Sequence, residues 1–118
     1  SMAQYEQFAI LLQPDQVEVL QVRRSDLDDL DFFHRYIKGF IEIVRLHDDV
    51  VMIVDDEGKL KGLPFNKAAT CLYNCDDIIV GPALVMKRRG PDLVPMTADE
   101  AARELFSIQC VFYSDDDE

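Results

Sequence analysis

Residue types that could bind an anion are concentrated in one acid-free segment, residues 58–75, of an otherwise acidic chain. The residues of interest are Gly58, Lys59, Lys61, Gly62, Asn66 and Lys67. Glycines allow close backbone approach, and Asn66 stands at a predicted helix start, where amide donors have no partner within the helix. Amide donors beside a lysine are the components of a phosphate or anion site. The segment therefore predicts a binding surface for a small anionic ligand or a protein partner.

A purely structural role explains the same segment. Gly58 and Gly62 then only shape turns, and Asn66 only caps the helix. The lysines within residues 59–61 then lie on the solvated face of a strand. The spacing favours this structural interpretation, because it matches no phosphate-binding loop of the form Gly-x4-Gly-Lys-Ser/Thr.

Glu42 is the remaining candidate, an acid within an otherwise apolar strand start. A buried carboxylate without a partner is costly, so an inward-facing Glu42 needs a neighbour such as Lys61, Lys67 or the Asn66 amide. An outward-facing Glu42 is an ordinary exposed strand residue, and we expect this second placement.

Catalysis has little support in the sequence. His34 and His47 lie in no nucleophile or ligand motif, and no Ser-His-Asp, Cys-His or paired-carboxylate arrangement has motif support. The acids at residues 48–49 and 55–57 fall at successive turns and could hold a divalent cation, but they lack EF-hand spacing. We therefore expect no catalytic residue, no metal and no cofactor, and an enzyme is the minority interpretation.

The three cysteines are Cys71, Cys75 and Cys110. Tetrahedral zinc usually takes four ligands in closely spaced pairs, and Cys110 has no Cys or His nearby. An odd number also excludes a complete set of internal disulfides. The cysteines therefore favour buried or half-buried thiols in a reducing compartment.

The first half of the chain reads as two hairpins around a helix. Residues 8–12 and 17–22 are predicted strands around a Pro14-Asp15 turn. A helix is expected from Ser25, whose hydroxyl caps it, to Gly39, which ends it. Residues 40–46 and 50–54 form the second hairpin, and residues 59–63 are expected to add a third strand to it.

The second half reads as a short helix, a strand and a main helix. Asn66 caps a short helix that runs to Leu72, and residues 77–86 form the longest strand, with a bulge or edge position at Gly81-Pro82. A basic loop over residues 87–95 follows, and Thr97 with Glu100 makes a capping box. The side chains expected to face inward from this helix are Ala101, Ala102, Leu105 and Ile108. Residues 110–113 are expected to add a terminal strand.

This order predicts an α+β fold with one mostly antiparallel sheet of about five to six strands, two main helices and one short helix. Residues 1–113 are expected to form a single domain, and residues 114–118 an acidic flexible tail. Ser1 and Met2 look like a remnant of expression. Exposed strand edges at Gly81-Pro82 or at residues 110–113 could pair with a second copy in a homodimer.

The formal net charge is −11, from 23 acidic and 12 basic side chains. This charge argues against general nucleic-acid binding and against docking on an anionic membrane. No apolar run approaches the roughly 20 residues that span a bilayer, so a soluble cytoplasmic protein is expected. The acid-free segment still leaves room for a local anion site.

Three segments resemble a bacterial and phage domain family of unknown function that recurs in phages, conjugative elements and some large DNA viruses. They are Tyr36-Ile37-Lys38-Gly39-Phe40-Ile41-Glu42-Ile43-Val44, Asp55-Asp56-Glu57-Gly58-Lys59-Leu60-Lys61-Gly62-Leu63-Pro64-Phe65-Asn66-Lys67 and Asp77-Ile78-Ile79-Val80-Gly81-Pro82-Ala83-Leu84-Val85. The middle segment is similar to the family's Gly-Lys-Leu-x-Gly-Leu-Pro-x-Asn signature. Two departures are Lys38, where the family often has a second glycine, and Lys67, where arginine is common.

The resemblance covers the chain from about Phe8 to Phe106 and implies a fold unit and a genomic setting, but no reaction. Together with the residues, it predicts a small non-enzymatic binding or accessory module of a phage, virus or mobile element. One alternative is an acidic DNA mimic, a decoy that occupies a DNA-binding protein of the host defence. Another is a binder of nucleotides or phosphorylated small molecules.

Overall fold

The computed structural model describes the backbone of residues 6–74 and 77–116, with side chains described as far as residue 109. The elements are β1 (Phe8–Leu12), β2 (Val17–Gln21), the 3-10 helix η2 (Arg24–Asp28), α1 (Leu30–His34), β3 (Ile41–His47), β4 (Val50–Asp55), α2 (Lys67–Leu72), β5 (Ala83–Arg89), β6 (Asp92–Val94) and α3 (Ala98–Asp116). The predicted α+β fold around a mostly antiparallel sheet is confirmed. All the strand pairs between these elements are antiparallel.

The strands lie in the order β2-β1-β5-β4-β3, and β6 pairs with the distal half of β5. One edge of β5 is shared by β1 at Ala83 to Val85 and by β6 at Lys87 to Arg89. The other edge pairs with β4. The strand after the Gly81-Pro82 dipeptide is therefore the centre of the sheet.

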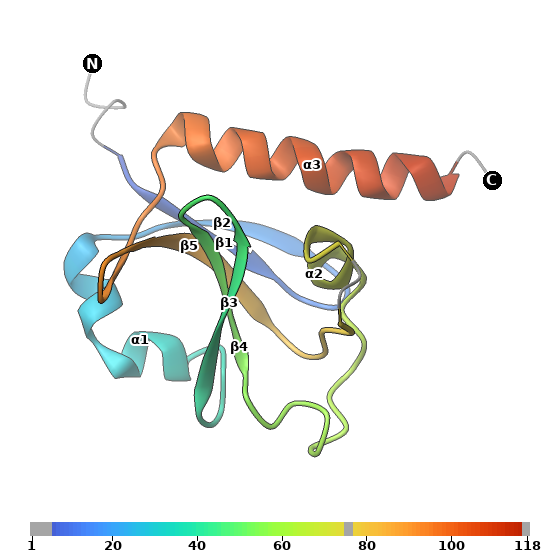
Figure 1. The fold of residues 1–118 in the computed structure, drawn as a ribbon, viewed down its shortest axis with the longest axis horizontal. Coiled ribbons are helices and arrows are strands. Elements are labelled where there is room, and N and C mark those ends of the chain that lie inside the picture. The colour runs from blue at the N-terminus through green and yellow to red at the C-terminus, as the bar shows by residue number, and fades with distance from the viewer. Residues whose placement is uncertain (1–5, 75–76, 117–118) are drawn as a thin grey trace.

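Helical segments cover both faces of this sheet (Figure 1), with α2 and α3 on one face and η2 and α1 on the other. Side chains alternate between faces along a strand, so the central strands contribute to two cores. On β4, Met52 packs toward the α2 and α3 face, and Ile53 packs toward the α1 face. Burial on both faces explains why these strands read as continuous apolar runs.

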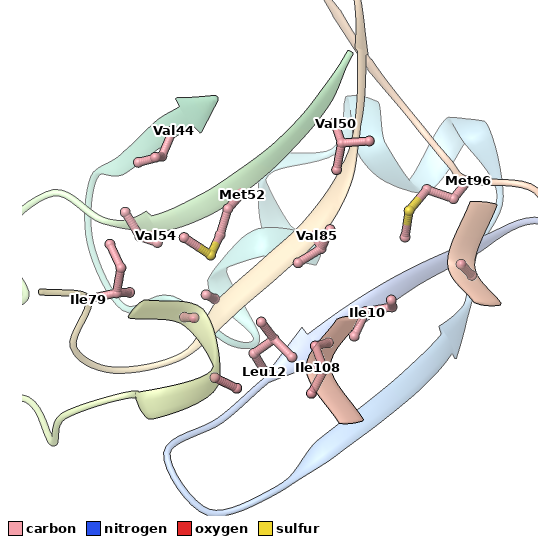
Figure 2. Close-up of a cluster of buried hydrophobic side chains, with 14 residues drawn as sticks. Ile10, Leu12, Val44, Val50, Met52, Val54, Ile79, Val85, Met96 and Ile108 are labelled. Atoms are coloured by element: carbon pink, nitrogen blue, oxygen red, sulfur yellow. The ribbon is translucent and has the colours of Figure 1, made fainter. Parts of the chain in front are cut away.

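The larger core lies under α2 and α3 (Figure 2), where Ile108 of α3 packs with Leu12 of β1 and Met52 of β4. Each of these side chains is at most 2% exposed. Full burial of such a side chain contributes about 1.5–3 kcal/mol relative to exposure. Ala68 and Ala69 of α2 belong to the same core, which holds this part of the acid-free segment on the sheet.

Local sequence signals placed several elements correctly. Both hairpins form as predicted, and Asn66 caps α2 by accepting a hydrogen bond from the Ala69 amide at 3.1 Å. The capping box at α3 also forms, because the Thr97 amide donates to Glu100 and the Glu100 amide donates to the Thr97 hydroxyl. These motifs depend on neighbours only three positions apart, so sequence alone suffices to find them.

The helix expected from Ser25 to Gly39 is wrong in extent. The chain instead forms η2, breaks at Asp29 and resumes as α1, which ends at His34. Asp29 has extended dihedral angles (φ −106°, ψ 115°), and its carboxylate accepts the Asp31 amide. Aspartate side chains compete in this way for backbone amides and favour caps over helix interiors.

Two predictions about strands and loops are wrong. Residues 59–63 form successive turns instead of a strand, with the Leu63 amide donating to the Gly58 carbonyl and the Gly62 amide to the Lys59 carbonyl. The expected basic loop over residues 87–95 is instead a hairpin of β5 and β6, which turns at Gly90 with φ +58°. In residues 59–63, short-range backbone hydrogen bonds favour turns over the strand that the alternation of lysine and leucine predicted.

The predicted strand over residues 77–86 begins only at Ala83, because Gly81 adopts φ +73° and turns the chain. Residues 110–113 lie within α3, so the predicted terminal strand is also wrong. Neither position is a sheet edge. The edges of the main strand order are β2 and β3, so the two predicted edge positions are wrong, whereas a homodimer itself stays a prediction.

Inward packing from α3 also differs in part from the prediction. Ala101 and Ile108 are buried and Leu105 is half-buried, whereas Ala102 is exposed and the acid Glu104 is buried in its place.

The helical backbone continues through residues 114–116, and the predicted flexibility of residues 114–118 stays a prediction. Ser1, Met2 and Cys75 lie outside the described residues. None of the helices in the described part of the chain is long and apolar enough to cross a membrane.

Candidate functional site

A turn-rich loop, residues 56–65, follows the end of β4 and leads to α2. The acid-free segment begins within this loop, at Gly58. Its glycines have different roles. Gly62 has φ +67°, and no other atom would lie within 4 Å of an added Cβ. Glycine is therefore favoured at this position only by the backbone conformation. A Cβ at Gly58 would lie 3.0 Å from a methyl group of Val80, so Gly58 is needed for close packing. Both roles agree with the structural interpretation of these glycines.

Lys61 is partly exposed, but its ammonium group ties the loop to the segment before β3 and to the end of β4. Its Nζ donates to the Lys38 carbonyl at 2.8 Å and to Asp55 Oδ2 at 2.7 Å. The Asp55 side chain is only 3% exposed. Burial alone would raise the pKa of Asp55, but the hydrogen bonds from Lys61 and from the Glu57 amide outweigh it and lower the pKa. Lys61 is thus the counter-ion of a buried carboxylate.

Lys59 is also paired, with Asp77 at 2.7 Å. Both side chains are more than half exposed, and the hydrogen bond from Lys59 is the main cause that lowers the pKa of Asp77. Exposed pairs of this kind contribute little to stability. The pairing nonetheless neutralises much of the positive charge that the sequence placed in the loop.

Asn66 is fully buried and connects three parts of the fold. Its Nδ2 donates to the Leu12 carbonyl at 3.0 Å and to the Gly81 carbonyl at 2.8 Å, while its Oδ1 accepts from the Ala69 amide. Its side chain is therefore fully used inside the protein. Lys67 follows it as the first residue of α2, which has only six residues.

A small pocket at this end of the sheet encloses about 130 Å³ and brings together Glu42, Gly58 and Lys59. Glu42 is exposed, as expected. Lys61, Gly62, Asn66 and Lys67 do not line this pocket. The carboxylates on its lining are Glu42, Asp55, Asp56 and Asp77. Lys59 pairs with Asp77, and Lys61 pairs with Asp55. The remaining excess of carboxylates still gives the pocket a negative field, which disfavours phosphate.

Large apolar side chains are exposed around this pocket. Leu60 at the tip of the loop is 86% exposed, Phe65 is 53% exposed and Ile78 is 55% exposed. Phe65 forms an isolated antiparallel bridge with Val80, so residues 77–80 lie alongside the end of the loop. We call the surface formed by Leu60, Phe65, Ile78 and the Lys59–Asp77 pair the loop surface.

A second group of charged residues, which the sequence did not reveal, connects α3 to the sheet. Both nitrogens of the His47 ring face carboxylates, Nδ1 that of Asp48 and Nε2 that of Glu104, which is buried. Partial burial lowers the pKa of His47, but its bonds and charge interactions with Asp48 and Glu104 outweigh this effect and raise the pKa. Beside them, Lys87 pairs with Glu100 at 2.9 Å.

This group also determines what His47 can do chemically. A general base needs one free ring nitrogen, and both are engaged here. The only sequence signal for the group was an acid, Glu104, on the helix face that also carries Ala101 and Ile108. Its partner His47 lies 57 positions away, a separation that no local pattern encodes.

The two acidic clusters that were considered for a cation do not come together. Residues 48–49 form the β3–β4 turn, whereas residues 55–57 lie at the other end of β4. Among the side chains that the structure describes, in residues 6–74 and 77–109, no group of three or more His, Cys, Asp or Glu is arranged to hold a metal ion. Cys71 is half-buried.

Fold and site together define a small single-domain α+β protein in which the loop over residues 56–65 is fixed by internal contacts and exposes apolar side chains. Residues 7–107 match the family model described as Domain of unknown function (DUF3846), and the chain belongs to this family. No curated protein and no solved structure matches the chain. The match agrees with the resemblance to a family of unknown function and brings no reaction with it.

Proposed function

We propose that this chain is a non-enzymatic binding module that contacts a protein partner through the loop surface. The observation that carries the proposal is the 86% exposure of Leu60, held at the tip of a loop that Lys61 and Asn66 anchor. Exposed apolar groups on a fixed backbone suit protein recognition, because little ordering entropy is lost on binding. The resemblance to mobile-element domains supports an accessory role in the cytoplasm of a phage-, virus- or element-bearing cell.

An anionic small molecule is a weaker candidate for the same residues. Nucleotides and drug-sized ligands occupy pockets of about 300–1,000 Å³. The pocket beside Gly58 and Lys59 has about 130 Å³, and Lys59 and Lys61 already face carboxylates. A protein partner needs no such volume, and its own charges can meet Glu42 and Lys59 at the rim.

The distribution of exposed acids gives little support to a DNA mimic. A mimic needs carboxylates in a row at about the phosphate repeat. Exposed acids instead occur on elements that cover opposite faces of the sheet, such as Asp31 on α1 and Asp99 on α3, and at both ends of β4. The loop surface concentrates apolar side chains and is the better contact candidate.

Affinity capture from the native host, followed by mass spectrometry, tests the proposal. The full chain is compared with Leu60→Asp and Ile78→Asp, which introduce a charge at exposed positions and should leave the fold intact. We expect both variants to lose a partner that the wild-type chain retains. Phe106→Asp is the matched control, because Phe106 is 67% exposed but lies on α3.

Equal recovery of every partner by Leu60→Asp and the wild-type chain would remove the loop surface as the contact. A thermal-shift screen with nucleotides and phosphorylated metabolites separates the small-molecule alternative, since a ligand that binds the folded state raises the melting temperature. Stabilisation that Lys59→Met abolishes would favour that alternative over a protein partner.

A further inference from the structure

A second apolar surface lies between α1 and the start of β3, on the face of the sheet opposite α3 (Figure 1). It is an open groove of about 600 Å³, lined by Leu30, His34, Lys38, Gly39, Phe40 and Ile41. Phe40 is 77% exposed and Leu30 is 56% exposed. Large exposed apolar side chains grouped beside one groove are typical of surfaces that contact another chain. We call it the Phe40 groove.

The charge of the Phe40 groove differs from that of the rest of the protein. Its lining includes the bases His34 and Lys38 and no acid. The Lys38 ammonium donates to the carbonyls of His34 at 2.8 Å and Arg35 at 3.3 Å, and no carboxylate of the described residues pairs with it. The groove therefore fits a segment that presents an apolar or aromatic side chain followed by carboxylates.

The chain itself carries such a segment. Residues 111–116 read Val-Phe-Tyr-Ser-Asp-Asp, in which two aromatic residues directly precede a run of acids. These residues continue α3, which packs on the sheet face opposite the groove (Figure 1). The sheet therefore separates the segment from the groove of its own copy.

We propose that residues 111–116 of a second copy dock in the Phe40 groove. Each copy has both the groove and the segment, and the proposal takes the docking as reciprocal, which gives a two-fold dimer instead of an open chain of copies. Apolar contact at Phe40 supplies the attraction, and Lys38 selects the acidic end of the segment. The interaction is independent of the proposed partner contact, since none of the groove residues belongs to the loop surface.

Sedimentation velocity of the full chain over a range of concentrations tests the proposal. We expect reversible dimerisation that Phe40→Ser weakens at least about tenfold, the loss expected for one aromatic contact. Lys38→Glu should weaken it as well, through repulsion of the acids. Leu60→Ser is the matched control, an even more exposed apolar residue on the loop surface, and should leave dimerisation unchanged.

The identity of the occupant is tested separately. Phe112→Ser should abolish dimerisation, and a mixture of the Phe112→Ser and Phe40→Ser chains should associate partially, because one groove and one segment remain compatible. A labelled peptide of residues 110–118 should bind the wild-type chain and not Phe40→Ser, which keeps the test valid if Phe112→Ser fails to fold. A chain that stays monomeric, a dimer that survives Phe40→Ser, or a peptide that does not bind would each overturn the proposal.

Discussion

The side-chain amide of Asn66 donates a hydrogen bond to the carbonyl oxygen of Leu12, 3.0 Å away in space and 54 positions away in sequence. The same nitrogen donates to Gly81 at the start of the central strand. One buried side chain thus joins the end of β1, the entry to β5 and the start of α2. Asn66 is therefore a structural residue in this protein.

Asn66→Ala should lower the free energy of unfolding by about 3 kcal/mol, because it removes the cap of α2 and leaves buried carbonyls without donors. Urea denaturation with an unchanged m-value measures the loss. Gln21→Ala, at an exposed amide side chain on β2, serves as control and should change stability by less than about 0.5 kcal/mol. Similar midpoints for the two variants would contradict the structural role of Asn66.

Gly81 and Gly62 both adopt positive φ, but their surroundings differ. A Cβ at Gly81 would lie 2.6 Å from a methyl group of Leu63, whereas a Cβ at Gly62 would meet nothing within 4 Å. Gly62→Ala should therefore cost only about 1 kcal/mol of backbone strain, and Gly81→Ala clearly more. The difference between their urea midpoints isolates the contact with Leu63, and equal midpoints would rule that contact out.

Lys61→Met and Lys59→Met separate a tethering lysine from a surface lysine. Removing Lys61 leaves the buried Asp55 carboxylate without its counter-ion and should cost about 2 kcal/mol or more. Removing Lys59 breaks an exposed pair and should cost less than about 0.5 kcal/mol. Chemical denaturation at neutral pH compares them, and an equal loss in both would contradict the distinction.

Acid unfolding adds a second measure of the Lys61 contact. The folded pKa of Asp55 is lowered from 3.8, so its contribution to stability is present above pH 3.8 and lost as the pH falls through the folded pKa. Without Lys61 the folded pKa rises. Lys61→Met should therefore begin to unfold at a higher pH than the wild-type chain, whereas Lys59→Met should follow the wild-type curve closely.

His47 should make the attachment of α3 depend on pH in the opposite sense. Its folded pKa is raised above 6.5, so its contribution is fully present below pH 6.5 and lost as the pH rises through the folded pKa. As the pH rises from 6.5 through the folded pKa of His47, the free energy of unfolding of the wild-type chain should fall relative to that of His47→Gln. Denaturation curves between about pH 5.5 and 8.5 measure this, and parallel profiles would contradict the pairing with Glu104.

Direct titration of the imidazole by NMR identifies the cause. Glu104→Gln keeps the shape of the side chain but removes its charge, so the pKa of His47 should fall relative to the wild-type value. Arg103→Gln, a charge change at an exposed position of the same helix, should shift it far less. A pKa of His47 that does not respond to Glu104→Gln would show that Glu104 is not its partner.

The sequence by itself determined the local elements of this protein. Both hairpins, the Asn66 cap and the Thr97–Glu100 capping box follow from turn residues and from hydrogen bonds between near neighbours. The acid-free segment and its lysines can also be recognised from the sequence. Signals of this kind depend on at most a few successive residues, so they need no knowledge of the fold.

Only the tertiary structure decided what those residues do. It placed β5 at the centre of the sheet, paired Lys61 with Asp55 and Lys59 with Asp77, and brought His47 to Glu104. It also left Leu60 and Phe40 exposed. The physical reason is that charge pairing and exposure depend on which segments meet across the sheet, and this is set by the packing of both cores together rather than by any one segment.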